Sequence, residues 1–293
     1  MSDFGGRVAV ITGAASGLGL AIARRAAGLG MKLVLADVER QALARVEEDF
    51  RKGGCELIAQ VLDVSDAAAV AELADQVFAR FGRVDLLFNN AGVAPVGLLW
   101  EQSDSEFRWA FGVNVLGVAN GIRSFVPRML EQKHSAHIVN TASVAGFISP
   151  TTMGLYNATK HAVVTLSETL HHDLRTVGAT IGVTVLCPAY VPTGIADSER
   201  NRPDQATKDG ATVSEYSLRA REAMQRAVQS GKLSADDVAL QTFQAIEQGR
   251  FYLFTHPAIL GAVEDRHAAI QAGGPPSDPF ARKPVLSPGA KPS

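Results

Sequence analysis

Tyr156 and Lys160 form the residue pair with the clearest chemical potential in this sequence. They lie four positions apart, and a helix of 3.6 residues per turn places both on one face. A lysine cation about 5 Å from a phenol favours the phenolate by roughly 3 kcal/mol, or about two pKa units. The pair therefore suits proton transfer, although an accidental pair on a helix surface would have the same spacing. Apolar residues at helical spacing support the helix: Ala162, Val163, Leu166, Leu170 and Leu174.

A serine precedes this pair by 13 residues, directly after an apolar run. Residues 137–143 predict a strand, and Ser143 stands at its carboxyl end. Open parallel sheets bind ligands beyond the carboxyl ends of their strands. Ser143 is thus placed to hydrogen-bond an oxygen on which charge develops. A loop hydroxyl is the simpler interpretation of a lone serine, but Tyr156 and Lys160 downstream favour the catalytic one.

A glycine-rich turn near the start of the chain connects a predicted strand to a predicted helix. Apolar, β-branched residues over 7–11 predict a buried strand, and apolar residues at helical spacing predict a helix over 18–29. A second strand over 32–36 ends at Asp37. Strand, glycine turn, helix, strand and acid is the order of a nucleotide-binding βαβ unit.

The three glycines of this turn each permit a different feature of such a site. Gly13 would allow a sharp turn, Gly17 would let backbone approach a pyrophosphate, and Gly19 would let the helix pack closely on the strand. The pyrophosphate would then meet the free N–H groups of the helix N-terminus. A glycine-rich turn without a ligand is the alternative, and Asp37, 18 residues beyond Gly19, favours the binding site.

The pattern Thr12-Gly13-x-x-x-Gly17-x-Gly19 resembles the cofactor motif of the short-chain dehydrogenases/reductases. The likeness covers about residues 5–256 and rests on five separated signatures. The others are Asn89-Asn90-Ala91-Gly92, Asn114-Val115-Leu116-Gly117, Ser143 with Tyr156 and Lys160, and the segment from Pro188 to Thr193.

This resemblance implies residues for catalysis and for cofactor binding. Tyr156 would exchange the hydroxyl proton, while Lys160 would lower its pKa and bind the nicotinamide ribose. Ser143 would hold the substrate oxygen, and Asn114 would hold a water next to Lys160. The implied catalytic set is Asn114, Ser143, Tyr156 and Lys160. The implied cofactor-binding set is Gly13, Ser16, Gly17, Leu18, Gly19, Asp37, Asp63, Val64, Asn90, Ala91, Gly92, Tyr156, Lys160, Pro188, Val191 and Thr193.

Asp37 favours NAD as the cofactor over NADP. Its carboxylate can accept hydrogen bonds from both ribose hydroxyls of NAD and would repel the 2′-phosphate of NADP. Neither Val38 nor Ser16 offers a cation for that phosphate, and we expect Arg40 to lie on the following helix. An NADP-preferring carbonyl reductase is the alternative.

The remaining segments continue the alternation of strands and helices, which indicates an α/β doubly wound parallel sheet in three layers. Further strands are predicted over 56–62, 85–89, 180–186 and 250–255. Further helices are predicted over 66–80, 106–130, 215–228 and 235–248, the last with a capping box of Ser234 and Asp237. The resemblance implies a Rossmann fold with strand order 3-2-1-4-5-6-7.

We expect one oxidoreductase domain over residues 1–272 and a Pro/Gly-rich tail over 273–293. The polar stretch 197–214 is long for a loop inside a compact domain, so we assign it to a substrate lid around 190–232. The resemblance implies a homodimer or homotetramer. Gly112, Gly117 and Gly121 in the helix over 106–130 would allow close packing of another subunit's helix.

Composition narrows the class of protein. The 293 residues carry a formal net charge of −2, so nothing points to nucleic acid or to an anionic membrane as a partner. The start has no pattern of a signal peptide, and no apolar run reaches the roughly 20 residues of a membrane span. Cys55 and Cys187 are expected as free thiols in a reducing cytoplasm. No Cys/His spacing indicates a metal site.

The implied activity is hydride transfer between NAD(H) and a hydrophobic secondary alcohol or ketone, aromatic ones included. The expected substrate pocket, over 93–100, 147–153 and from Tyr190 onward, is largely apolar. Residues 201–203 and 251–256 are also similar to bacterial Cα-dehydrogenases that act on lignin-type aryl ethers.

Two other classes remain as alternatives. A non-catalytic NAD-binding regulator would lose one of Ser143, Tyr156 and Lys160, and none is lost. A halohydrin dehalogenase would carry Arg in place of Lys160 and lack the phosphate-binding glycines.

Overall fold

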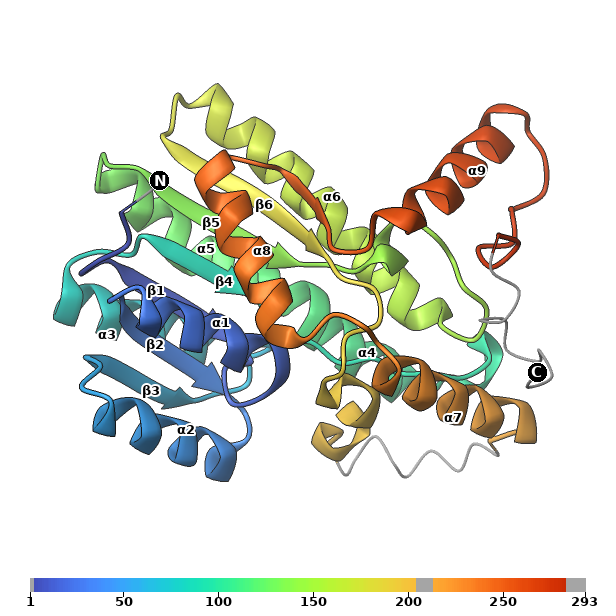
Figure 1. The fold of residues 1–293 in the computed structure, drawn as a ribbon, viewed down its shortest axis with the longest axis horizontal. Helices are drawn as coiled ribbons and strands as arrows, with labels where there is room; N and C mark the ends of the chain where they lie inside the picture. Colours follow the sequence, from blue (N-terminus) through green and yellow to red (C-terminus); the bar gives the residue numbers. More distant parts are fainter. Residues whose placement is uncertain (1–2, 204–212, 283–293) are drawn as a thin grey trace.

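The computed structural model describes residues 3–203 and 213–282. Its centre is a seven-stranded sheet in the order β3-β2-β1-β4-β5-β6-β7, and every neighbouring pair is parallel. The expected α/β doubly wound sheet and its strand order are confirmed (Figure 1).

The strands are β1 (Val8–Thr12), β2 (Lys32–Asp37), β3 (Leu57–Val61), β4 (Leu86–Asn89), β5 (Ala136–Thr141), β6 (Ile181–Cys187) and β7 (Tyr252–Phe254). The α-helices are α1 (Gly17–Gly28), α2 (Arg40–Lys52), α3 (Ala67–Phe81), α4 (Asp104–Phe111), α5 (Gly117–Glu131), α6 (Gly154–Thr176), α7 (Glu215–Gln229), α8 (Ala235–Gln248) and α9 (Leu260–Gln271). Short helical segments are η1 (Leu99–Glu101), the π-helix η2 (Gly112–Leu116), η3 (Val144–Gly146), η4 (Gly194–Asn201) and η6 (Pro257–Ile259).

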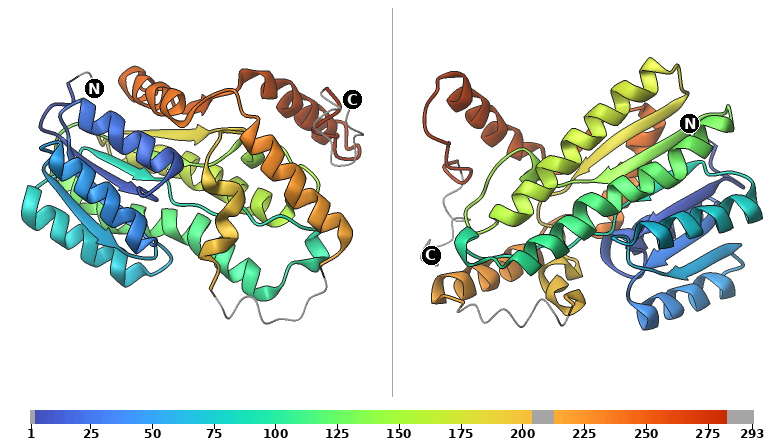
Figure 2. Two further views of the ribbon diagram at one scale, coloured as in Figure 1. Left: turned by 60° about the horizontal axis from the view of Figure 1, so that its bottom comes forward. Right: turned by 180° about the vertical axis from the view of Figure 1, so that it is seen from behind.

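Strand β1, near the middle of the sheet, is buried on both faces, as its apolar sequence predicts. Ala9 and Ile11 pack in the cluster that includes α1, α2 and α8, while Val8 and Val10 pack in the cluster that includes α3, α5 and α6. Side chains alternate along a strand, so one apolar run serves both layers. The two sets of helices lie on opposite faces (Figures 1 and 2).

All seven strands point the same way, so their carboxyl ends meet at one edge of the sheet. The strand order reverses between β1 and β4, and ligands of open α/β sheets bind at such a reversal. The glycine turn after β1 and the segments after β4, β5 and β6 all leave the sheet at this edge. The fold therefore brings four of the five sequence signatures together.

The helix expected over 106–130 is interrupted. Residues 112–116 form the π-helix η2, which joins α4 to α5 and contains Asn114. A π segment adds one residue to the turn and is frequent at functional sites.

The glycines around this segment face the protein's own core, which corrects our expectation of a subunit contact there. A Cβ on Gly117 would lie 2.7 Å from Val64 Cγ2, and one on Gly121 would lie 2.0 Å from Asn89 Oδ1. A Cβ on Gly112 would lie 3.2 Å from that of Ser65. These glycines therefore allow α5 to lie against β4 and the loop after β3.

The second half departs from the expected loop at 197–214. Residues 194–201 form the helical segment η4, and 204–212 lie outside the described residues. The α8 capping box is confirmed, with the Ser234 hydroxyl accepting from Asp237 N at 3.1 Å.

Helix α9 stands away from the sheet (Figure 1). Arg282, in the expected tail, forms a salt bridge of 2.6 Å with Asp265 of α9.

Candidate functional site

The turn between β1 and α1 leaves no room for side chains at two of its glycines. Gly13 has φ +66°, and a Cβ there would lie 2.9 Å from Ala91 Cα. A Cβ on Gly19 would lie 1.9 Å from Gly13 O. The turn therefore packs tightly on the segment after β4, and residues 16–19 at the start of α1 line the pocket at this edge of the sheet.

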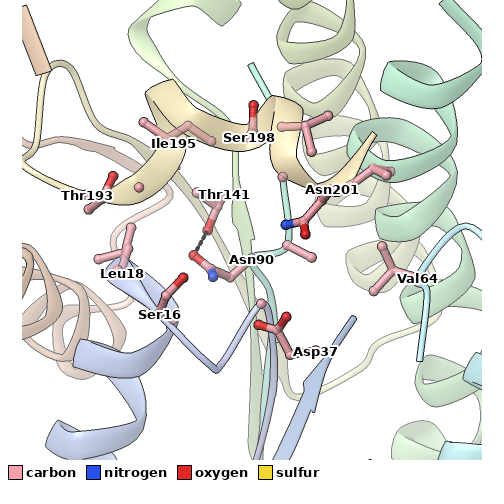
Figure 3. A pocket seen from close by; sticks show the side chains of 18 of the residues that line it. Ser16, Leu18, Asp37, Val64, Asn90, Thr141, Thr193, Ile195, Ser198 and Asn201 are labelled. Carbon is pink, nitrogen blue, oxygen red and sulfur yellow. Dashed lines mark hydrogen bonds between the residues drawn. The ribbon is translucent and has the colours of Figure 1, made fainter. Parts of the chain in front are cut away.

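Thr12 and Asn90 fasten this turn to the segment after β4. The Thr12 hydroxyl accepts from Asn90 N at 2.9 Å and Ala91 N at 3.0 Å, and Asn90 Nδ2 donates to Thr12 O at 3.0 Å. Thr141 Oγ1 at the end of β5 donates to Asn90 Oδ1 at 3.2 Å (Figure 3). Asn90 thus ties together the ends of three strands.

One pocket opens at this edge of the sheet, and every residue of the implied cofactor-binding set lines it. Ser143 lines it as well, whereas Asn114 does not. Figure 3 shows the segment that carries Thr193, Ile195 and Ser198 facing Ser16 and Asp37 across the pocket. Gly194, Ile195, Ser198, Arg200 and Asn201, from the expected lid, also line it. Residues that the sequence did not indicate as part of the site line it as well: Glu39, Leu62, Trp109, Val113, Thr141, Ala142 and Ala189.

Asp37 is held in place at the end of β2 by two backbone groups. Its Oδ2 accepts from Ala15 N and its Oδ1 from Glu39 N, both at 2.9 Å. Each carboxylate oxygen keeps a further lone pair. The carboxylate is thus oriented beside the glycine turn and can still accept hydrogen bonds from two adjacent hydroxyls.

Ser143 and Tyr156 lie close together in the buried part of the pocket. The Ser143 hydroxyl donates to Pro188 O at 3.3 Å and accepts from Ala145 N at 3.1 Å. Burial raises the pKa of Tyr156 to about 12, while a hydrogen bond with Ser143 acts in the opposite direction. Both hydroxyls border the same space, where one substrate oxygen would meet the two of them.

Lys160 is buried one turn along α6 from Tyr156. Its Nζ donates to Thr141 O at 2.8 Å and lies 5.6 Å from the centre of the Tyr156 ring. Burial lowers the pKa of Lys160 to about 8.

The expected lowering of the phenol's pKa beside this lysine is not found. Burial of Tyr156 has the largest effect, and the phenol's pKa rises instead of falling. Our expectation from charge separation alone was wrong because it left out the removal of water from both groups.

Asn114 is positioned by the π-helix η2 but uses its side chain internally. Its Oδ1 accepts from Val93 N at 2.8 Å, and its Nδ2 donates to Val93 O and to Thr159 Oγ1, both at 2.9 Å. Both N–H groups of the amide are therefore engaged. The side chain links the segment after β4 to α6, which carries Tyr156 and Lys160.

Tyr156 belongs to a cluster of apolar side chains. Tyr156 packs with Ala94, Ala145 and Met153, and with Ile195 and Met224 at their edge. Ala94 and Met153 come from segments where we expected the substrate pocket, and Ile195 and Met224 come from the expected lid. Ser198 Oγ accepts from Ala94 N at 2.9 Å and so holds η4 against this apolar group.

Residues 3–203 and 213–282 hold no cluster of three or more His, Cys, Asp or Glu side chains placed for a metal ion. Over the same residues, no helix is both long and apolar enough to cross a membrane.

Comparison with known proteins gives consistent matches. The family model for short chain dehydrogenases matches residues 7–204. A CLA biosynthesis dehydrogenase/reductase of Lactiplantibacillus plantarum is 35% identical, over 94% of this chain and 97% of the relative. A C alpha-dehydrogenase of a Sphingobium species is 34% identical, over 92% of this chain and 87% of the relative.

Solved structures agree with these sequence matches. A short chain dehydrogenase/reductase from Burkholderia phymatum, solved in complex with NAD, is 56% identical, with a TM-score of 0.93, and covers 96% of this chain and 100% of its own. This likeness and the match of the family model over 7–204 identify the same family. The chain belongs to the short-chain dehydrogenase/reductase family.

Proposed function

We propose that this protein is an NAD-dependent dehydrogenase/reductase that acts on hydrophobic secondary alcohols or ketones. The observation that carries the proposal is the convergence of Ser143, Tyr156 and Lys160 on the pocket that the glycine turn borders. A bound nicotinamide dinucleotide would supply the hydride acceptor or donor. The chain's own residues would supply binding, orientation and proton transfer.

Tyr156 is the proposed general acid and base. A phenol whose pKa is about 12 keeps its proton at neutral pH, so it is ready to protonate a carbonyl oxygen as that oxygen gains charge. Ser143 would hold the same oxygen by a second hydrogen bond. In the oxidative direction the same phenol would take up the hydroxyl proton.

Lys160 and Asn114 are the proposed means of returning that proton. The Lys160 ammonium, whose pKa burial lowers to about 8, can exchange a proton near neutral pH more readily than an exposed lysine. The side chain of Asn114 holds the neighbouring segments together, so we assign the water beside Lys160 to its main-chain carbonyl in the π-helix.

NAD is the proposed cofactor. Asp37 lines the pocket at the end of β2, beside Val38, which carries no charge. The relative from Burkholderia phymatum was solved in complex with NAD. Asp37 would accept the ribose hydroxyls and repel a 2′-phosphate.

The proposed substrate class follows from the apolar group around Tyr156. Ala94, Met153, Ile195 and Met224 offer contact area and no charge, which favours a hydrophobic alcohol over a sugar. The similarity to a C alpha-dehydrogenase is in keeping with an aryl carbinol.

Replacement of Tyr156 by Phe tests the proposal. The variant Tyr156→Phe removes one hydroxyl and keeps the ring, so we expect turnover to fall by about 10³-fold or more and the Kd for NADH to stay within about threefold. The measurement is nicotinamide absorbance over a panel of hydrophobic secondary alcohols and ketones, with NADH binding followed by fluorescence. Tyr252→Phe is the matched control, because this half-exposed phenol bonds Glu168 and does not line the pocket. Turnover retained in Tyr156→Phe would contradict the proposed mechanism.

We further propose a single catalytic domain over 1–272 with a substrate lid around 190–232. The protein would work in the cytoplasm and would assemble as a homodimer or homotetramer. The two cysteines, Cys55 and Cys187, are free thiols, in keeping with a reducing compartment. Leu116, on the outer side of the π-helix, is 52% exposed and would suit a subunit contact. Light scattering of the purified protein tests the assembly.

A further inference from the structure

Glu39 lies two residues beyond Asp37 and binds the segment on the far side of the cofactor pocket. Its Oε1 accepts from Arg200 Nε at 2.9 Å, from Arg200 Nη2 at 2.6 Å and from Asn201 Nδ2 at 3.0 Å. The partners are more than 160 residues away in the sequence, on η4. The carboxylate therefore joins the end of β2 to the segment that follows β6.

Four of the five N–H groups of Arg200 donate hydrogen bonds, two to Glu39 and two to backbone oxygens. Its Nη1 donates to Gly194 O and to Asp197 O, both at 2.9 Å. The hydrogen bond from Asn201 holds the pKa of Glu39 below its usual value, and Arg200 acts in the same direction. Glu39 is thus ionised at neutral pH, and the charge of the guanidinium is balanced.

The pair borders the part of the pocket where a dinucleotide would place its adenosine ribose. Asp37, Val38, Glu39 and Arg200 all line the pocket. Lys160, the other cation among the described lining residues, bonds Thr141 O at the end of β5. Strand β5 is three strands away from β2 in the sheet. Arg200 is therefore the cation at the Asp37 end.

We propose that Glu39 is a second residue that selects NAD over NADP, because it occupies Arg200 and places another negative charge beside Asp37. This inference rests on the proposed function in that it assumes a nicotinamide dinucleotide in the pocket. Arginine binds phosphate well through paired N–H groups, so a 2′-phosphate would compete with Glu39 for Arg200. With Glu39 ionised, the phosphate would have to displace one carboxylate and remain close to another.

The geometry also allows a plainer role, in which Glu39 only holds η4 in place. The two roles predict different results when the charge is removed. If Glu39 only holds η4 in place, removal of its charge weakens the binding of NADH and of NADPH alike. If Glu39 keeps Arg200 from a 2′-phosphate, removal of its charge strengthens the binding of NADPH alone. The ratio of the two affinities therefore separates the roles.

The test is titration of NADH and NADPH by nicotinamide fluorescence, against wild type, Glu39→Gln and the double variant Glu39→Gln/Arg200→Gln. We expect Glu39→Gln to tighten NADPH binding by about tenfold, as for one additional charge-assisted hydrogen bond, and to change NADH binding by less than about threefold. The double variant should bind NADPH no more tightly than wild type, because the phosphate ligand is gone.

Glu47→Gln is the matched control. One oxygen of the Glu47 carboxylate accepts hydrogen bonds from Arg51 Nε at 3.0 Å and Nη2 at 2.7 Å, which is the arrangement that Glu39 has with Arg200. Glu47 does not line the cofactor pocket. It should leave both affinities unchanged.

Three results would overturn the inference: unchanged NADPH binding in Glu39→Gln, equal weakening of both dinucleotides, or tighter NADPH binding that persists in the double variant. Turnover retained in Tyr156→Phe would overturn only the proposed mechanism, because binding ratios do not depend on turnover. Absence of dinucleotide binding in the wild type would overturn both.

Discussion

Lys160 illustrates at the level of one residue how a catalytic group costs stability. The ammonium is buried, and its one hydrogen bond to the described residues goes from Nζ to Thr141 O. Burial lowers its pKa from 10.5 to about 8 in the folded protein. The folded protein thus releases this proton at lower pH than the unfolded chain, and stability from this group rises with pH between about 8 and 10.5. Below pH 8 the buried charge is destabilising.

Replacement of Lys160 by Met should therefore stabilise the cofactor-free protein at pH 7. The pKa shift corresponds to about 3 kcal/mol, and the unpaired Thr141 O would cost about 1 kcal/mol in return. We expect the free energy of unfolding to rise by about 2 kcal/mol, with the increase shrinking between pH 8 and 10.5, in urea titrations at several pH values. Lys52→Met is the control, because Lys52 is exposed in a pair with Glu48. A loss of stability in Lys160→Met at pH 7 would contradict the argument.

Helix α1 shows at the level of one element that the effect of a glycine depends on its surroundings, because two of its three glycines differ in what lies around them. A Cβ on Gly19 would lie 1.9 Å from Gly13 O, whereas Gly28 at the other end has nothing within 4 Å. The first allows α1 to meet the glycine turn. Gly28 lowers the helix propensity of α1, and no close packing depends on its missing side chain.

The two Gly→Ala substitutions should therefore have opposite effects. We expect Gly19→Ala to lower the free energy of unfolding by about 3 kcal/mol or more and to weaken NADH binding, since backbone must move. We expect Gly28→Ala to raise stability by about 0.5 kcal/mol. Urea unfolding and NADH fluorescence measure both. If Gly19→Ala matched wild type in stability, the close approach of α1 to the glycine turn would be wrong.

At the scale of the whole molecule, the pocket depends on segments from most of the chain. Its lining runs from Gly13 to Asn201 and includes ends of strands from both halves of the sheet. An unfolded chain offers no such surface, so a ligand that binds here stabilises the folded state by mass action.

NAD should therefore raise the thermal unfolding temperature. At 100 times its Kd, a ligand contributes about 2.7 kcal/mol, which corresponds to a shift of about 5 °C for a chain of this size. NADP at the same concentration should give a smaller shift, because of the carboxylates of Asp37 and Glu39. Thermal unfolding followed by circular dichroism measures both. Equal shifts would contradict the proposed selectivity.

Much of this protein was determined by the sequence alone. The strand order, the glycine turn and the convergence of Ser143, Tyr156 and Lys160 were all predictable. The strand order followed from the resemblance to the short-chain dehydrogenases/reductases. The glycine turn and the convergence depend on local spacing and on one general property, namely that parallel strands place their carboxyl ends at one edge. The catalytic roles of these residues stay predictions.

The tertiary structure decided what depends on burial and on interactions between distant segments. Burial set the direction of the Tyr156 pKa against the expected one, since removal of water does not follow from spacing. The π-helix turned the Asn114 side chain onto Val93. The pair of Glu39 and Arg200 joins residues 161 positions apart, which no local pattern records, because only the packed chain brings the two side chains together.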